Sequence, residues 1–130
     1  MIENALRVAL VEHLRGDPAL QSKINSVTEE APSRASPPWL AVVASASTDW
    51  SVKGRTGREV RVALELQMRG DDPHAASAMV QAVQDRVESL PRMQAGFELV
   101  TTTFLRARME QRVRNTRAAL VEYRFRAFAD

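Results

Sequence analysis

Residues 58–69, which read REVRVALELQMR, decide the fold of this chain. Apolar side chains occupy every second position of this stretch, and charged or polar side chains fall between them. Because successive side chains of a strand point to opposite sides, this alternation predicts a β-strand with one buried face and one wet face. A helix could not sort the same residues onto two faces. The side chains expected in the core are Val60, Val62, Leu64, Leu66 and Met68.

The segments before this strand predict helical and extended elements in turn. Residues 2–15 repeat apolar side chains at helical spacing, and Asp17 before Pro18 caps a short second helical turn. A brief strand is expected over 24–28, followed by a proline-rich loop over 29–38.

The next strand is expected over 39–50, where the sequence is apolar on both sides. A loop over 51–57 then joins it to the opening strand as an antiparallel hairpin. The side chains expected together on one face of this strand are Leu40, Val42, Ala44 and Ala46.

Beyond the opening strand, Asp71, Asp72 and Pro73 predict the start of a helix that runs to about residue 90. Its apolar stripe should lie on the apolar side of the sheet. Two long strands, starting at Phe97 and Arg117, then flank a basic turn. We expect one face of the first to carry Phe97, Leu99, Thr101, Thr103, Leu105, Ala107 and Met109, and the second to bury Ala119, Val121, Tyr123, Phe125 and Ala127.

These elements predict an α+β fold for a single domain over residues 1–130. The sheet is expected to be mixed and mostly antiparallel, with four to five strands, an N-terminal helix and one long helix packed on one face. If the long helix crosses the sheet once, the loop around Arg55 and the turn around Arg114 lie at opposite ends of the sheet.

The composition limits the kinds of function open to the chain. Eighteen Lys and Arg against sixteen Asp and Glu leave a net charge of +2, which does not demand a nucleic-acid or membrane partner. The absence of cysteine excludes disulfides, thiolate catalysis and cysteine-based zinc sites. No long apolar run predicts a membrane span, and the charged amino terminus does not resemble a signal peptide.

No grouping of residues predicts catalysis, a metal or a cofactor. His13 and His74 have no further ligand at suitable spacing on the same helix face. Gly54 and Gly57 lie in a hairpin without the Lys-Ser or Lys-Thr ending of a phosphate loop. Ser45 and its neighbours lack the context of a nucleophile elbow.

Among the charged residues, the arginines of the last two strands follow a regular pattern that predicts where they lie in the fold. They alternate onto the outward faces of two neighbouring strands and also decorate the turn between them. Either they form a solvated face with Glu98, Glu110 and Glu122 as partners, or they meet carboxylates of an adjacent subunit or a phosphate backbone. The residues are Arg106, Arg108, Arg112, Arg114, Arg117, Arg124 and Arg126.

Several stretches, taken in order, resemble the tail terminator or tail-completion proteins of long-tailed phages and gene transfer agents. The likeness covers nearly the whole chain and is most specific in the run Thr48, Asp49, Trp50 and Ser51, followed by Gly57, Arg58 and Glu59. The other stretches are ALRVALVEHLRGDPAL, DPHAASAMVQAVQDRVESL and FLRARMEQRVRNTRAALVEYRFRAF.

The resemblance implies a virion structural protein without enzymatic activity or cofactor. Such a protein forms a ring, expected to be a hexamer, on the head-proximal end of the tail tube, stops tube growth and joins the head-to-tail connector. DNA passes through the ring without sequence-specific contacts, and no membrane is involved. The alternatives are another neck component, such as a connector or stopper, and a small basic nucleic-acid-binding protein. The candidate contacts to neighbouring proteins are Trp50, Lys53, Arg55, Arg58, Arg106, Arg108, Arg112, Arg114, Arg117, Arg124 and Arg126.

Overall fold

The computed structural model describes residues 1–30, 35–70 and 72–130. Part of the predicted loop over 29–38 and the predicted capping residue Asp71 lie outside the described residues. The elements follow in the order α1 (Ile2–Arg15), α2 (Pro18–Gln21), β1 (Ser26–Thr28), β2 (Trp39–Asp49), β3 (Gly57–Arg69), α3 (Pro73–Glu88), β4 (Met93–Gln94), β5 (Phe97–Arg112) and β6 (Thr116–Ala129).

The strands form one sheet in the order β1-β2-β3-β6-β5-β4. Only β1 and β2 are parallel, and the other neighbours are antiparallel, so the predicted α+β class with a mixed, mostly antiparallel sheet is confirmed. Over the described residues the sheet has six strands, where four to five were expected. The difference comes from β4, whose two residues are too few to produce a periodic pattern.

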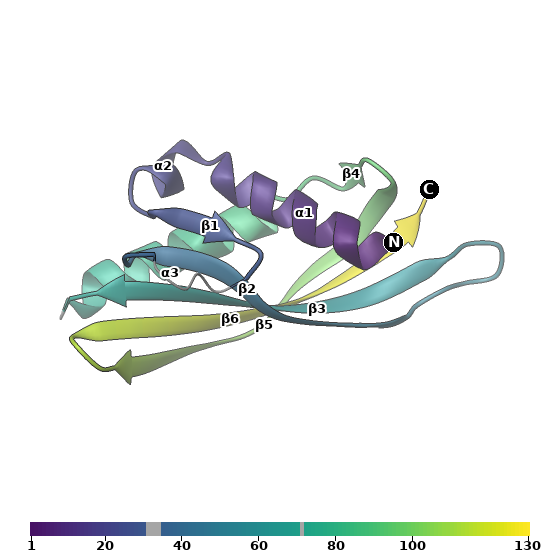
Figure 1. Cartoon of the computed structure of the whole chain (residues 1–130). Coiled ribbons are helices and arrows are strands. Elements are labelled where there is room, and N and C mark those ends of the chain that lie inside the picture. The colour runs from purple at the N-terminus through teal and green to yellow at the C-terminus, as the bar shows by residue number, and fades with distance from the viewer. Residues whose placement is uncertain (31–34, 71) are drawn as a thin grey trace.

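The helices lie on one face of the sheet, as predicted, and none of the described residues forms a helix on the opposite face (Figure 1). We call this second surface the helix-free face. The β2–β3 loop lies at one end of the sheet and the β5–β6 turn at the other, as expected from a single crossing of the sheet by α3 (Figure 1).

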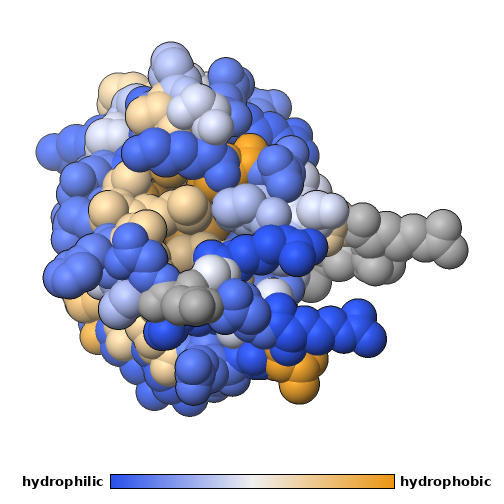
Figure 2. Space-filling model, turned by 90° about the vertical axis from the view of Figure 1, so that its left-hand side faces the viewer, coloured by the Kyte–Doolittle hydropathy of each residue, from blue (hydrophilic) through white to orange (hydrophobic). Residues whose placement is uncertain are grey.

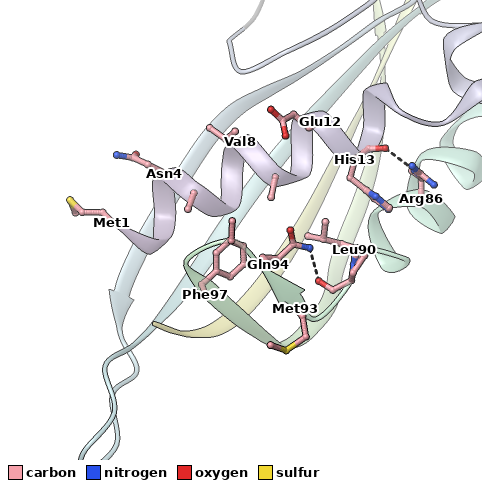
Figure 3. Close-up of a pocket in the computed structure, with 14 residues that line it drawn as sticks. Met1, Asn4, Val8, Glu12, His13, Arg86, Leu90, Met93, Gln94 and Phe97 are labelled. Atoms are coloured by element: carbon pink, nitrogen blue, oxygen red, sulfur yellow. Dashed lines mark hydrogen bonds between the residues drawn. The ribbon is translucent and has the colours of Figure 1, made fainter. Parts of the chain in front are cut away.

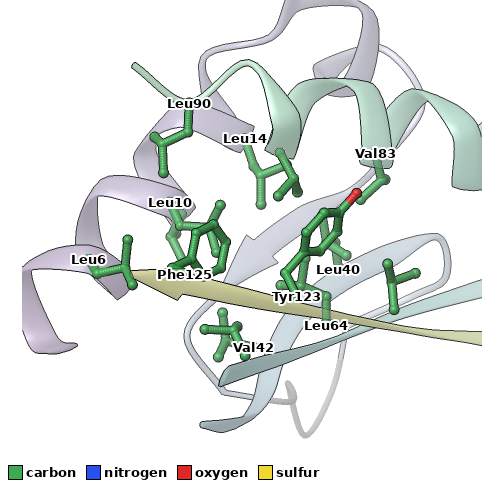
Figure 4. Packing of buried hydrophobic residues seen from close by; sticks show 14 of the residues in the cluster. Leu6, Leu10, Leu14, Leu40, Val42, Leu64, Val83, Leu90, Tyr123 and Phe125 are labelled. Carbon is green, nitrogen blue, oxygen red and sulfur yellow. The ribbon is translucent and has the colours of Figure 1, made fainter. Parts of the chain in front are cut away.

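The core forms where α1 and α3 press on the apolar side of the sheet (Figure 4). The five core residues predicted for β3 are at most 2% exposed. Leu6, Leu10 and Leu14 of α1 meet them from above, together with Val83 of α3. Burying each such side chain stabilises the fold by roughly 1.5–3 kcal/mol.

Both predicted aspartate caps that the structure describes are present. Asp17 accepts a hydrogen bond from the backbone N–H of Ala19 at 3.1 Å, and Asp72 accepts one from His74 at 2.9 Å. Each aspartate thereby satisfies an N–H group that the first helical turn leaves without a partner.

A β-bulge at Val43 makes the predicted facing of β2 wrong beyond Val42. The bulge shifts the register against β3, so Ser45 rather than Ala44 lies opposite the buried Val62. Because one extra residue reverses the alternation, Ala44 and Ala46 lie on the helix-free face.

Two bulges in β5, at Val100 and Leu105, correct the prediction in the same way. Between them the alternation is reversed, so Thr101 and Thr103 lie on the helix-free face and Phe104 lies opposite Tyr123 on the apolar side. The second bulge restores the original alternation.

Candidate assembly surfaces

The β2–β3 hairpin closes on a tight turn in which Val52 and Arg55 exchange two backbone hydrogen bonds of 3.0 Å. Gly54 in this turn has a φ of +82°, a conformation that side chains other than glycine's disfavour. The predicted contact residue Lys53 lies at the tip and is exposed, as are Val52 and Arg55.

An aromatic stack anchors the base of this hairpin to the end of β6. The rings of Trp50 and Phe128 stack with centroids 4.9 Å apart. The guanidinium of Arg55 lies 4.4 Å from the Phe128 ring, and that of Arg126 lies 5.4 Å from the Trp50 ring. These cation–π contacts hold three predicted contact residues in one cluster, and Phe128 is a member that the sequence reasoning missed.

Arg58 does not join this cluster. Its side chain lies on the opposite, helix-covered face, where Nε donates a hydrogen bond to Ser47 at 2.9 Å. The same nitrogen lies 3.5 Å from a carboxylate oxygen of Glu3 on α1. Arg58 therefore ties α1 to the hairpin strands.

The β5–β6 turn carries Arg114 and Asn115 in left-handed conformations, with φ of 59° and 58°. Val113 is 81% exposed at its tip. Arg112 pairs with Glu110 at 2.9 Å, whereas Arg114 is exposed and forms no ion pair with any described residue. Figure 2 looks onto this end of the molecule, which is mostly covered by hydrophilic side chains.

Arg117 lies just past this turn but on the apolar side of β6. It stands opposite Met68, and its Nε donates a hydrogen bond to the carbonyl of Gly70 at 3.3 Å. This bond ties β6 to the loop that follows β3.

Glutamates neutralise most of the predicted arginine strip on the helix-free face. Arg106 pairs with Glu122 at 2.8 Å, and Arg108 pairs with Glu110 at 3.2 Å. Hydrogen bonding to Arg106 lowers the pKa of Glu122. The nearby Arg126 donates to Glu59 at 3.0 Å, while Arg124 reaches that carboxylate only at 3.9 Å.

A shallow groove of about 730 Å³ separates α1 from the segment after α3 (Figure 3). Its walls are of mixed polarity, and among their apolar residues Val8 and Met93 are 47% and 71% exposed. His13 lies at one end, where burial and the charge of Arg86 lower its pKa. The groove brings together no nucleophile, base and acid in the way that catalysis needs.

The comparison with known proteins agrees with the architecture. A family model described as "Tail completion protein gp17" matches residues 8–130. The chain belongs to this family. The predicted resemblance to tail-completion proteins is therefore confirmed, and with it the prediction of a structural protein of a virion tail.

One solved structure, described as "Virion of native gene transfer agent (GTA) particle", matches this tail completion protein over nearly its whole length. The match has a TM-score of 0.83 and 21% identity, and it covers 98% of this chain and 97% of the other. At that identity the likeness shows a shared fold. Among curated protein sequences, none matches the chain.

Both long edges of the tail completion protein's sheet are open over most of their length. β1 covers β2 only from Trp39 to Ala41, and β4 covers β5 only at Phe97 and Glu98. Within the described part of the chain, the outer edges of 43–49 and 100–112 pair with no other strand. Exposed edges of this kind pair readily with another chain.

The described residues of this family member contain no group of three or more His, Asp or Glu that could hold a metal ion. None of the helices in those ranges combines the length and the apolar character of a membrane span.

Proposed function

We propose that this chain is a tail terminator, a structural protein that acts as a ring and catalyses no reaction. Several copies, six by the family resemblance, cap the head-proximal end of the tail tube and stop its growth. The ring then joins the tube to the head-to-tail connector, and DNA passes through its centre. Membership of the tail completion family and the shape of the sheet support this proposal.

The observation that best supports a ring is that both long edges of the sheet are open. Because β2, β3, β6 and β5 alternate in direction, the free edges of β2 and β5 run antiparallel to each other. Placing β5 of one copy beside β2 of the next extends the sheet with correct hydrogen bonding. The two edges differ, so the contact is heterologous, and its repetition closes a ring when the rotation between copies permits.

The two ends of the sheet then offer separate surfaces to the tube and the connector. Each end carries an exposed valine beside an exposed cation, Val52 with Lys53 and Val113 with Arg114. An apolar anchor flanked by positive charge suits a partner with an apolar pocket and acidic rim. The predicted contact residues at the two hairpins thus remain candidates for these opposite partners.

The experiment is a native mass measurement on the purified chain, alone and with tail tubes. A closed oligomer is expected in at least one of the two samples. Val43→Lys places a charge on the free edge of β2 and should abolish the oligomer while leaving the monomer folded, because edge lysines block strand pairing. A chain that stays monomeric in both samples would rule out the ring.

Val52→Lys is the matched control, since Val52 is also exposed but lies at the hairpin tip. This variant should keep the ring and weaken only the contact with a neighbouring tail component. Loss of the ring in both variants would show that the effect does not come from the strand edge.

A further inference from the structure

Two arginines stand directly opposite each other at the centre of the helix-free face. Arg61 of β3 pairs in register with Arg124 of β6, and both side chains point away from the helices. Like charges at directly opposed positions of a sheet destabilise it. The arrangement therefore needs a negative charge to compensate it.

The chain supplies little of that charge. Arg61 is exposed and forms no ion pair with any described residue. Arg124 lies 3.9 Å from an oxygen of Glu59 that already accepts a hydrogen bond from Arg126. The neighbouring carboxylate of Glu122 is held by two hydrogen bonds from Arg106.

Two polar atoms at this place also lack partners. Nε of Arg124 and the hydroxyl of Thr101 are buried without a hydrogen bond among the described residues. Thr101 and Thr103 both lie on the helix-free face, and Thr103 stands opposite Arg124. Native proteins satisfy nearly all such groups, so these two unsatisfied atoms just beneath the surface leave the polar groups around Arg124 incompletely paired within the chain.

The protein surface beside Arg61 is recessed. A depression of about 300 Å³ borders it, with the small side chains of Ala44, Ala46 and Ala63 in its lining. Leu105 and Glu122 also line it, and the Glu122 carboxylate is held by Arg106. No long side chain of β2 stands over Arg61 on this side, because the bulge at Val43 turns alanines to this face. An extended ligand can therefore approach the sheet closely here.

The charged residues are also unevenly distributed between the four long strands and the rest of the chain. Residues 39–69 and 97–130, which form β2, β3, β5 and β6, contain twelve Lys and Arg against seven Asp and Glu. The other described residues, 1–30, 35–38, 70 and 72–96, which include the helices, contain five against eight. An anionic ligand is thus attracted to the sheet and repelled by the helical layer.

A linear polyanion fits this surface better than a single carboxylate. Arg69 also lies on the helix-free face, is exposed and forms no ion pair with a described residue. It follows Arg61 along β3 by eight positions, or about 27 Å at the rise of a strand. One carboxylate cannot serve both places, whereas a phosphodiester chain carries a charge at every step.

We infer that the helix-free face binds the phosphate backbone of duplex nucleic acid, with Arg61 and Arg124 at the centre of the contact. Among the described residues, the indole and phenyl rings on this face are Trp39, Trp50 and Phe128. Trp39 is only 6% exposed, and Trp50 and Phe128 are stacked on each other, so none of them forms an exposed platform for stacking on bases. Binding is therefore independent of sequence. The inference rests on the proposed function only for the source of the nucleic acid.

The test measures binding of the full-length protein to a mixed-sequence DNA duplex by fluorescence anisotropy at several salt concentrations. Arg61→Gln with Arg124→Gln should weaken binding and reduce the slope of log K against log salt by about two, or one per lost phosphate contact. Lys23→Gln with Arg92→Gln removes the same charge from the helical segments and should leave the slope nearly unchanged.

Thermal unfolding separates binding from folding in this test. Removing the opposed charges should raise the melting temperature of the double variant, because the repulsion disappears. An unchanged salt slope, or an equal loss in the control pair, would overturn the inference. So would a double variant that loses the ring but keeps its DNA affinity, because the pair would then serve carboxylates of a second copy. DNA binding is measured whether or not a ring forms. A negative result for DNA binding therefore does not contradict the ring proposal, which the native mass measurement tests separately.

Discussion

Arg106 donates two hydrogen bonds across the β5–β6 pair to the carboxylate of Glu122, from Nε at 2.8 Å and from Nη2 at 3.1 Å. The contact raises the pKa of Arg106 and lowers that of Glu122. A two-pronged pair of this kind fixes the register of neighbouring strands. Because its guanidinium is already paired within the chain, Arg106 is less available to another protein than the sequence pattern indicated.

Reversing this pair should destabilise the hairpin in a way that the double swap repairs. Arg106→Glu places two carboxylates opposite each other and is expected to lower the urea midpoint, and Arg106→Glu with Glu122→Arg should restore most of it. In 1 M salt the loss should shrink, because charges at the surface are screened over about 3 Å. A swapped variant as unstable as the single variant would show that charge is not the cause.

Tyr123 should remain protonated at alkaline pH until the chain unfolds. Burial, and the hydrogen bond that its hydroxyl donates to Glu88 at 2.7 Å, raise its pKa above the ordinary value of 10.0. The folded state therefore holds the proton more tightly than the unfolded state. The contribution of Tyr123 to the free energy of unfolding is fully present below pH 10.0 and is lost as the pH rises further.

The measurement is direct because Tyr123 is the only tyrosine of the chain. Tyrosinate absorbance should appear together with loss of circular dichroism in an alkaline titration. Titration near pH 10 in a folded chain would contradict the prediction. Tyr123→Phe should cost about 1 kcal/mol of unfolding free energy, the net value of one hydrogen bond, and should flatten the alkaline dependence.

Gly57→Ala should disturb the junction between the β2–β3 hairpin and β6. A Cβ at this position would lie 2.5 Å from the carbonyl oxygen of Trp50 and 3.0 Å from a ring carbon of Phe128. Overpacking of this kind typically costs about 1–3 kcal/mol. The check is the free energy of urea unfolding, with the exposed neighbour Thr56→Ala as a control that should change it little. A Gly57→Ala protein as stable as the parent would mean that the backbone yields without cost.

Leu64→Ala should destabilise the core of the sheet. Leu64 is 1% exposed and packs between the sheet and the helices, so truncation leaves a cavity and costs about 2–5 kcal/mol. Val113→Ala, at the exposed turn, should stay within about 0.5 kcal/mol of the parent. Chemical denaturation measures the free energy of unfolding of both variants. A loss for Val113→Ala as large as that for Leu64→Ala would contradict the prediction.

Local patterns in the sequence determined the elements and their faces wherever the strands are regular. The alternation in 58–69 and 117–128 is uninterrupted, and both strands bury the predicted side chains. Helical spacing and the aspartate caps likewise placed α1, α2 and the start of α3. These features depend on neighbours a few residues away, so a single chain segment contains the information.

The tertiary structure alone decided the bulges at Val43, Val100 and Leu105, and with them the outward position of Ala44 and Thr101. A bulge is set by the pairing of two strands distant in sequence, and each one reverses the side-chain alternation that follows. The same pairing decided which arginines have a glutamate within reach. Sequence reasoning singled out the strip on the last two strands and missed Arg61, because only the β3–β6 register places Arg61 opposite Arg124.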